Sequence, residues 1–211
     1  FEMIGFLMES FPETEDKKLM RENVERINDG IIRIENIINS MKEMFNQSKL
    51  QKENANIFST VITSTVLAFN KAKHITKIFI NGEEFNLDFD KEKENYIAFI
   101  DKQRVEQVWV IIINNAIDEL MKIESFNDRR LDIDISQDDS HVIITFKDNA
   151  GGINKDIMEE LFEPFKGTKE SSGMGVGLSI AKNIIEQQKG KIKAYNENGG
   201  AVFKITLNKA E

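Results

Sequence analysis

The chain has 211 residues, of which 40% are hydrophobic and 30% charged, and its formal net charge is −8 at pH 7. Such a composition is ordinary for a soluble globular protein, and the acidic balance argues against a nucleic-acid partner, which would require a basic face. The longest apolar run, Val108 to Ile113, is too short to cross a bilayer. The absence of cysteine excludes disulfides and thiolate metal sites and fits a cytoplasmic location.

Residues 1–50 predict a helical hairpin, whose first helix is interrupted by the proline and acidic residues of "PETED" at 12–16. The apolar residues Ile32 and Ile37 widen the seam of the second helix, which favours a four-helix bundle. Because one chain supplies only two helices, we expect a homodimer; an ordinary core helix packed on its own domain is the alternative. The seam itself follows a heptad pattern through Met20, Val24, Ile27, Ile31, Ile34, Ile38, Met41 and Phe45.

Residues 56–208 form a second predicted domain, which follows a polar junction at 46–56. Its mixture of helical periodicity and two-residue alternation predicts an α/β sandwich, with helices covering one face of an antiparallel sheet. The chain as a whole is therefore expected to be α+β. The expected helices are 61–72, 102–124, 154–160 and 176–188, and the expected strands are 57–60, 76–81, 84–88, 95–100, 130–136, 141–147, 190–196 and 201–207.

Two sequence clusters carry polar side chains at positions that suggest binding. In "VIIINNAIDEL" (110–120), Asn114 and Asn115 follow an apolar helical run, and an asparagine oxygen is a suitable ligand for Mg²⁺. In "KDNAGGI" (147–153), Asp148 ends a strand and precedes two glycines, where it can accept a hydrogen bond from an adenine amino group. Taken alone, the first cluster could be a helix asparagine bonded to backbone, and the second could be a simple turn.

Two further clusters follow in the sequence. "LFEPFKGTKESS" (161–172) suggests a hydrophobic hinge followed by a mobile lid, although a surface loop would look similar. In the next stretch, Gly173, Gly175 and Gly177 lead into an amphipathic helix, and a glycine-rich helix start can cradle phosphate with backbone N–H groups. This stretch is neither a Walker loop nor a dinucleotide-binding fingerprint.

In order and spacing, "NNA", "DNAGGI", "LFEPF" and "GMGVGLSIAK" resemble the N, G1, F and G2 boxes of sensor histidine kinases. These kinases belong to the ATPase superfamily of type II topoisomerases, MutL-like repair proteins and a heat-shock chaperone. Over residues 56–208 the resemblance implies an ATP-binding domain of the Bergerat fold. Over 1–46 it implies the dimerisation hairpin that precedes this domain, with a truncated first helix.

The resemblance implies ATP and Mg²⁺ as cofactors and assigns roles by position. Asn115 would bind Mg²⁺, Asp148 would bind the adenine amino group, and Gly152 would shape the base pocket. The glycine-rich segment would close over the phosphates, with Lys166 or Lys169 contacting them. The implied cofactor-binding residues are Asn115, Asp148, Gly152, Ile153, Phe165, Lys166, Lys169, Gly173, Gly175, Val176, Gly177 and Leu178.

Three positions depart from the family pattern. Many relatives carry a second asparagine one helical turn before Asn115, and hydrolytic relatives carry a glutamate there, whereas this chain has Ile111. Isoleucine cannot accept a proton, so the hydrolase interpretation loses its general base. Ala150 replaces the first glycine of the G1 box, and Val202 stands where relatives often have a hydroxyl that assists adenine binding.

Neither histidine of the chain fits the acceptor motif of the family, in which an acid and a proline follow the histidine. Both His74 and His141 are therefore expected to be structural, and the acceptor is expected to lie a few residues before Phe1. The resemblance implies a kinase that phosphorylates that histidine and passes the phosphoryl group to the aspartate of a response regulator receiver domain. Any membrane attachment would come through upstream segments. The alternatives are a superfamily ATPase and a non-catalytic, nucleotide-binding dimeric scaffold.

Overall fold

The computed structural model describes residues 18–28, 30, 31, 50–166 and 175–210. The chain divides into two units, Phe1–Asn46 and Gln47–Glu211. In the described part of the chain, no helix combines the length and the apolarity needed to span a bilayer.

In the first unit, residues 18–28, 30 and 31 are helical, which confirms the helix predicted for these residues. The seam residues Met20 and Ile27 are 60% and 56% exposed within the chain, and Ile31 is 38% exposed. The remaining predicted seam positions, from Ile34 to Phe45, lie outside the described residues, as does the predicted first helix of the hairpin.

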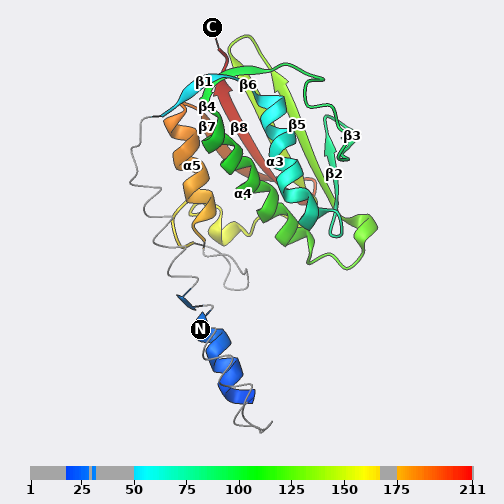
Figure 1. Cartoon of the computed structure of the whole chain (residues 1–211), viewed down its shortest axis with the longest axis vertical. Helices are drawn as coiled ribbons and strands as arrows, with labels where there is room; N and C mark the ends of the chain where they lie inside the picture. Colours follow the sequence, from blue (N-terminus) through cyan, green and yellow to red (C-terminus); the bar gives the residue numbers. More distant parts are fainter. Residues whose placement is uncertain (1–17, 29, 32–49, 167–174, 211) are drawn as a thin grey trace. The chain divides into compact units, whose positions relative to one another are not determined.

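The second unit is a two-layer structure in which helices cover one face of a six-stranded sheet of order β3-β2-β5-β6-β8-β7 (Figure 1). Among the strand pairs of the described residues, only β2–β5 is parallel. A separate two-stranded antiparallel sheet joins β1 to β4. The elements are β1 (Lys52–Asn56), α3 (Ile57–Ala72), β2 (Lys77–Ile80), β3 (Glu83–Glu84), β4 (Ile97–Asp101), α4 (Lys102–Leu120), η1 (Phe126–Asp128), β5 (Arg130–Gln137), β6 (His141–Asp148), η2 (Lys155–Ile157), α5 (Gly177–Gln187), β7 (Lys191–Glu197) and β8 (Gly200–Asn208).

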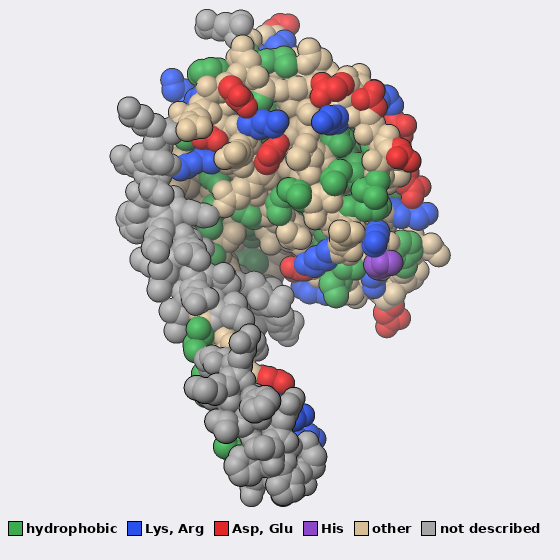
Figure 2. Space-filling view, viewed as in Figure 1, with side chains coloured by type: hydrophobic (Ala, Val, Ile, Leu, Met, Phe, Trp, Pro, Cys, Tyr) green, Lys and Arg blue, Asp and Glu red, His purple; other side chains and the backbone are tan. Residues whose placement is uncertain are grey.

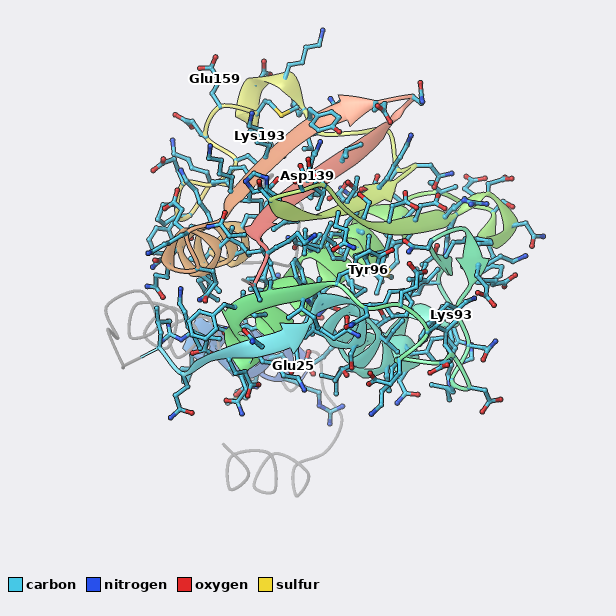
Figure 3. The ribbon with its side chains drawn as sticks, turned by 90° about the horizontal axis from the view of Figure 1, so that it is seen from above. Glu25, Lys93, Tyr96, Asp139, Glu159 and Lys193 are labelled. Atoms are coloured by element: carbon cyan, nitrogen blue, oxygen red, sulfur yellow. The ribbon has the colours of Figure 1, made fainter. Side chains whose placement is uncertain are left out.

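The core lies between the sheet and the helices, and a view turned by 90° separates the two layers (Figure 3). Trp109 of α4 is fully buried against Phe146 of β6, with ring centroids 5.5 Å apart. Its indole N–H donates to the Thr60 hydroxyl of α3 at 3.0 Å, so one side chain ties both helices to the sheet. The inward residues of the central strands alternate with outward ones, most of which are polar, and include Leu131, Ile133, Ile135, Val142, Ile144, Ile205 and Leu207.

The outer surface of the helical layer mixes hydrophobic side chains with charges of both signs (Figure 2). On α3, Val66 and Leu67 are exposed, whereas Val61 and Ile62 are buried. Apolar residues therefore occupy more of this helix than the stripe that packs on α4, and some of them contact solvent.

The structure corrects the predicted strand at 57–60, which is the first turn of α3. The Asn56 side-chain oxygen accepts the backbone N–H groups of Phe58 and Tyr96, both at 3.1 Å, so this residue caps the helix and fixes the preceding chain beside β4. Apolar residues such as Ile57 fit a strand or a buried helix start equally well. The N-cap that Asn56 provides is what makes these residues the start of a helix and not a strand.

Three predicted elements are shorter in the structure. The strand predicted at 84–88 is the short β3, and the helix predicted at 154–160 is only the 3₁₀ turn η2. The helix predicted at 102–124 ends at Leu120, where the chain turns so that the Arg129 guanidinium can bind the carbonyl oxygens that follow the helix. The other predicted strands and the helix at 176–188 are confirmed to within about two residues at each end, a scatter that is normal for element boundaries.

Candidate functional site

Asp148 is the last residue of β6, and only 5% of it is exposed. Its Oδ1 atom accepts the backbone N–H of Ala150 at 2.9 Å and that of Ala201 at 3.2 Å. Burial raises the pKa of this carboxyl above its ordinary value, and these two hydrogen bonds oppose the rise. Because both bonds fall on Oδ1, the second oxygen, Oδ2, remains the atom that can accept a hydrogen bond from a ligand.

One face of α4 connects Asp148 to the start of α5. Ile111, Asn115 and Glu119 recur every four residues and so share a face of the helix. At one end of this face, a Cβ on Gly177 would lie 3.2 Å from Ile111 Cγ2. At the other end, the charge of Glu119 adds to the burial that raises the pKa of Asp148. Asn115 therefore lies between the end of β6 and the beginning of α5.

The Asn115 side chain is partly exposed, and no residue in the described ranges hydrogen-bonds its amide. The amide oxygen is thus available to a ligand. Oxygen atoms of this kind suit Mg²⁺, which keeps several water or phosphate ligands beside one or two from the protein.

The start of α5 offers backbone donors. The helix begins at Gly177 with no side-chain cap and no acidic residue in its first turn. The first N–H groups of a helix have no partner within it, and the helix dipole adds partial positive charge there. The preceding Gly175 has a φ of 67° and Val176 is buried, so the approach to the helix is fixed by the fold. This end of α5 can bind an anion.

The two ends of the segment between Phe165 and Gly175 are joined, since the Phe165 N–H donates to the Gly175 carbonyl at 2.8 Å. Phe165 adopts a φ of 65°, which is unfavourable for a bulky residue, and 58% of it is exposed. The neighbouring Lys166 pairs with Glu160 at 2.7 Å. The predicted ligands Lys169 and Gly173 lie outside the described residues.

The loop after Asp148 is supported by the turn between β7 and β8. Gly151 and Gly152 both have positive φ, 91° and 84°, and the Gly151 N–H donates to the Gly199 carbonyl at 2.9 Å. A Cβ on Gly200 would lie 1.7 Å from the Asp148 carbonyl oxygen, so only glycine fits at this crossing. The end of β6 and the start of β8 therefore form one rigid junction.

The structure thus places Asn115 between Asp148 and Gly177 along one side of α4. Gly152 and Ile153 follow in the loop after Asp148, where both contact Asn196, and Val176 and Leu178 flank Gly177 at the start of α5. It revises the expectation for Val202, which pairs with Lys147 and so points to the sheet face opposite the Asp148 carboxylate. Ala201 is the residue on the Asp148 side. The motifs also gave no sign of Asn196, whose contact with Ile153 depends on strand register.

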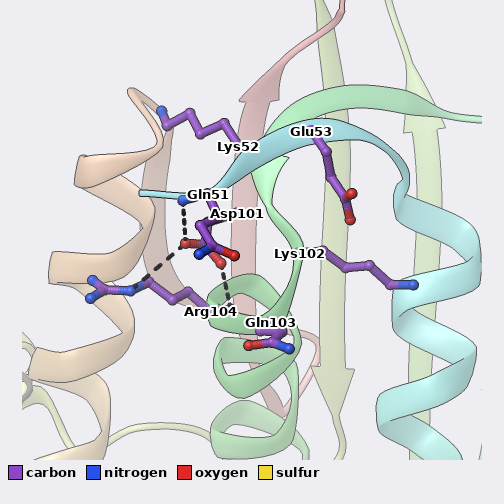
Figure 4. A pocket seen from close by; sticks show the side chains of 7 residues that line it. All are labelled: Gln51, Lys52, Glu53, Asp101, Lys102, Gln103 and Arg104. Carbon is purple, nitrogen blue, oxygen red and sulfur yellow. Dashed lines mark hydrogen bonds and ion pairs between the residues drawn. The ribbon is translucent and has the colours of Figure 1, made fainter. Parts of the chain in front are cut away.

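A separate polar hollow of about 560 Å³ lies at the other end of α4 (Figure 4). Lys52 and Arg104 border it, as do Gln51 and Asp101, and Asp101, which caps α4, accepts the Gln51 N–H. Arg104 is eleven residues from Asn115, or about 16 Å along a helix that rises about 1.5 Å per residue. The hollow is therefore distinct from the site around Asp148.

Residues 100–211, just over half of the chain, match the histidine kinase-, DNA gyrase B- and HSP90-like ATPase family, so the chain belongs to that family. Its sequence relatives place it more narrowly, as a sensor histidine kinase catalytic core. Sporulation kinase A of Bacillus subtilis (strain 168) is 30% identical over 173 residues, which are 81% of this chain but 24% of that protein. The chain thus spans about a quarter of this relative.

Two solved structures have the same fold. The catalytic domain of the histidine kinase ThkA superposes with a TM-score of 0.62 at 24% identity, over 75% of this chain and 96% of that domain. ThkA in complex with the response regulator protein TrrA superposes with a TM-score of 0.70 at 22% identity, over 98% of this chain and 56% of ThkA. The second unit is accordingly an α/β ATPase domain of the Bergerat type.

A first prediction concerns the cost of burying the Asp148 carboxylate. Because its pKa is higher in the folded than in the unfolded chain, the ionised group destabilises the fold above that pKa, and stability is regained as the pH falls through it. We expect Asp148→Asn to be at least as stable as the wild type at pH 7, and its advantage to shrink as the pH is lowered. Urea unfolding over this pH range measures the difference.

The matched control is Asp156→Asn, which neutralises an exposed aspartate on η2. It should leave the pH dependence of stability almost unchanged. A variant Asp148→Asn that is less stable than the wild type at pH 7 would contradict this account of the buried carboxylate.

Proposed function

We propose that the chain binds Mg·ATP at the site around Asp148 and serves as the catalytic core of a protein-histidine kinase. The observation that carries the proposal is the meeting of three groups from three elements: Asp148 Oδ2, the Asn115 amide and the start of α5. Neither the Oδ2 atom nor the amide has a hydrogen-bond partner among the described residues, and no side chain caps the helix. The carboxylate can accept a hydrogen bond from a purine amino group, and the amide oxygen can bind a divalent cation. The N–H groups at the start of α5 can bind a phosphate chain.

The purine would bind at the Asp148 end of the site. Its amino group would donate to Oδ2, while Ala150 and Ala201 hold Oδ1. The loop of Gly151 and Gly152 would pass beneath the base, since neither residue carries a side chain that would obstruct it. Recognition would thus depend on a carboxylate whose orientation is fixed before the ligand arrives.

The phosphates would lie between Asn115 and the start of α5. Mg²⁺ would be held by the Asn115 oxygen and by phosphate oxygens, and it would neutralise the charge that develops during phosphoryl transfer. Lys166 could join the phosphates by leaving Glu160, because an exposed ion pair contributes only about 0–1 kcal/mol. Most of the rate acceleration would come from positioning and charge neutralisation.

In the proposed reaction a neutral imidazole nitrogen attacks the γ-phosphorus of ATP. A P–N bond forms, the bond between the γ-phosphorus and the bridging oxygen breaks, ADP leaves, and the imidazole proton is lost to solvent. The phosphoryl group then passes to an aspartate of a response regulator, and the likeness to ThkA, solved with TrrA, supports this partner. Ile111 favours a kinase over a hydrolase, because its hydrocarbon side chain packs on Gly177 and cannot activate water.

The acceptor histidine is proposed to lie outside this chain. His141 begins β6, where it faces Asp138 at 3.3 Å, and His74 is exposed in the turn after α3. Both belong to the same unit as the nucleotide site, and the first unit contains no histidine.

Isothermal titration with Mg·ATP tests nucleotide binding. We expect saturable binding that Asp148→Asn weakens roughly tenfold to hundredfold, as for loss of a hydrogen bond to a charged group. Asn115→Ala should abolish the gain in affinity that Mg²⁺ confers but leave binding in EDTA nearly unchanged. Asn114→Ala, one position away on the same helix, is the control and should behave as the wild type. Absence of binding would contradict the proposal.

Incubation with γ-labelled Mg·ATP separates the kinase from the ATPase. We expect neither self-labelling nor steady hydrolysis by the 211-residue chain, and labelling once the chain is extended upstream of Phe1. The label should be lost in acid and retained in alkali, as a P–N bond requires. Self-labelling by the shorter chain would contradict the placement of the acceptor, and sustained phosphate release would favour the hydrolase.

We further propose that the chain forms a homodimer through its first unit. The exposed Met20, Ile27 and Ile31 recur at heptad spacing, and burial of this stripe against a second copy would remove it from water. The same bundle, extended upstream of Phe1, would then present the acceptor histidine and a surface for the response regulator.

Sedimentation tests the dimer. Ile27→Lys places a charge in the seam of each copy, so we expect the dimer to weaken by about a hundredfold or more, given at least about 1.5 kcal/mol for each buried isoleucine. Glu22→Lys introduces the same residue on the opposite side of the helix and should have little effect. A monomeric wild type at micromolar concentration would overturn the proposal.

A further inference from the structure

The hairpin of β7 and β8 contacts the Asp148 loop at three points. Two of them use backbone atoms: the Ala201 N–H bonds to Asp148 Oδ1, and the Gly199 carbonyl accepts the Gly151 N–H. The third depends on the side chain of Asn196, near the end of β7. Asn196 is therefore the contact that a substitution can remove without changing the backbone.

The Asn196 amide binds both backbone groups of Ile153. Its Oδ1 accepts the Ile153 N–H at 2.7 Å, and its Nδ2 donates to the Ile153 carbonyl at 2.8 Å. In the reverse orientation Nδ2 would face the Ile153 N–H, a donor against a donor, and Oδ1 would face the Ile153 carbonyl, an acceptor against an acceptor. The hydrogen-bond pattern therefore fixes the orientation of the amide. The side chain pairs with the loop as a neighbouring strand would.

Asn196 also restricts position 152, the residue before Ile153, to glycine. A Cβ on Gly152 would lie 2.7 Å from Asn196 Oδ1, and Gly152 already has a φ of 84°. Two consecutive glycines in this region lose much conformational freedom when the loop is ordered. The two hydrogen bonds from Asn196 offset part of that loss at the far end of the loop, while Ala150 is held by Asp148 at the near end.

We propose that Asn196 is a positioning residue that orders residues 150–153 before a nucleotide binds and thereby sets the selectivity of the site for adenine. The inference rests on the proposed nucleotide function and adds a residue from outside the four sequence clusters. If the loop becomes less ordered, the Ala150 N–H no longer holds Asp148 Oδ1 in place, and the position of Oδ2 relative to the purine varies. The start of α5 belongs to another element, so contacts to the phosphates are retained.

The experiment compares ATP with inosine triphosphate, which has the same ribose and phosphates but an oxo group in place of the adenine amino group. We expect Asn196→Ala to weaken ATP roughly five- to tenfold, as for two exposed hydrogen bonds, and to change inosine triphosphate much less. The ratio of the two dissociation constants should therefore fall. Asn196→Asp keeps the acceptor but loses the donor, and its carboxylate would face the Ile153 carbonyl, so it should not restore the ratio.

Amide hydrogen exchange in the nucleotide-free protein gives a second readout. In Asn196→Ala the Ile153 amide should exchange faster, while the amides of Ile205 and Leu207 in the core of β8 should not change. Asn208→Ala, at the far end of β8, is the matched control and should alter neither exchange at Ile153 nor nucleotide selectivity.

The outcomes separate the inference from the proposed function. Faster exchange at Ile153 with a reduced preference for ATP supports the inference. Unchanged exchange, or faster exchange with the preference intact, overturns it and leaves nucleotide binding in place. If the wild type itself binds neither nucleotide, or binds both equally, the proposed function fails at the outset and the inference fails with it.

Discussion

The junction between the end of β6 and the start of β8 is the constraint on which the site depends. The Asp148 carboxylate is buried there because Ala201 and Ala150 direct their N–H groups at one of its oxygens and leave the other free. The crossing is so close that no side chain fits at Gly200. A buried carboxylate with a raised pKa is unfavourable for folding, and groups of this kind gather at functional sites.

The second organising element is α4, which carries an apolar, an amide and an acidic side chain along a single face. Ile111 contacts the beginning of α5, Asn115 offers its amide, and Glu119 approaches Asp148. The opposite face holds the core, where Trp109 is buried against Phe146 and bonded to Thr60. One helix therefore supports the domain on one side and arranges the ligand contacts on the other.

The sequence predicted most of the domain because local signals agree with the fold. β5 and β6 alternate cleanly, and the glycines before α5 precede an amphipathic helix. β1 was missed since its five residues, "KENAN", are polar and pair only with β4, so it has the composition of a linker. The roles of Ala201 and Asn196 depend on strand register, which one sequence does not specify: a shift of one residue exchanges the two faces of a strand. Asp148 and Asn115 could be proposed as site residues because each stands in a recognisable motif.

The most direct test of the central claim is a crystal structure of the chain with Mg²⁺ and a non-hydrolysable ATP analogue. The account predicts that the adenine amino group lies within hydrogen-bonding distance of Asp148 Oδ2, that the Asn115 oxygen binds Mg²⁺, and that the phosphates face the start of α5. A nucleotide bound elsewhere, such as in the polar hollow between Lys52 and Arg104, would contradict it.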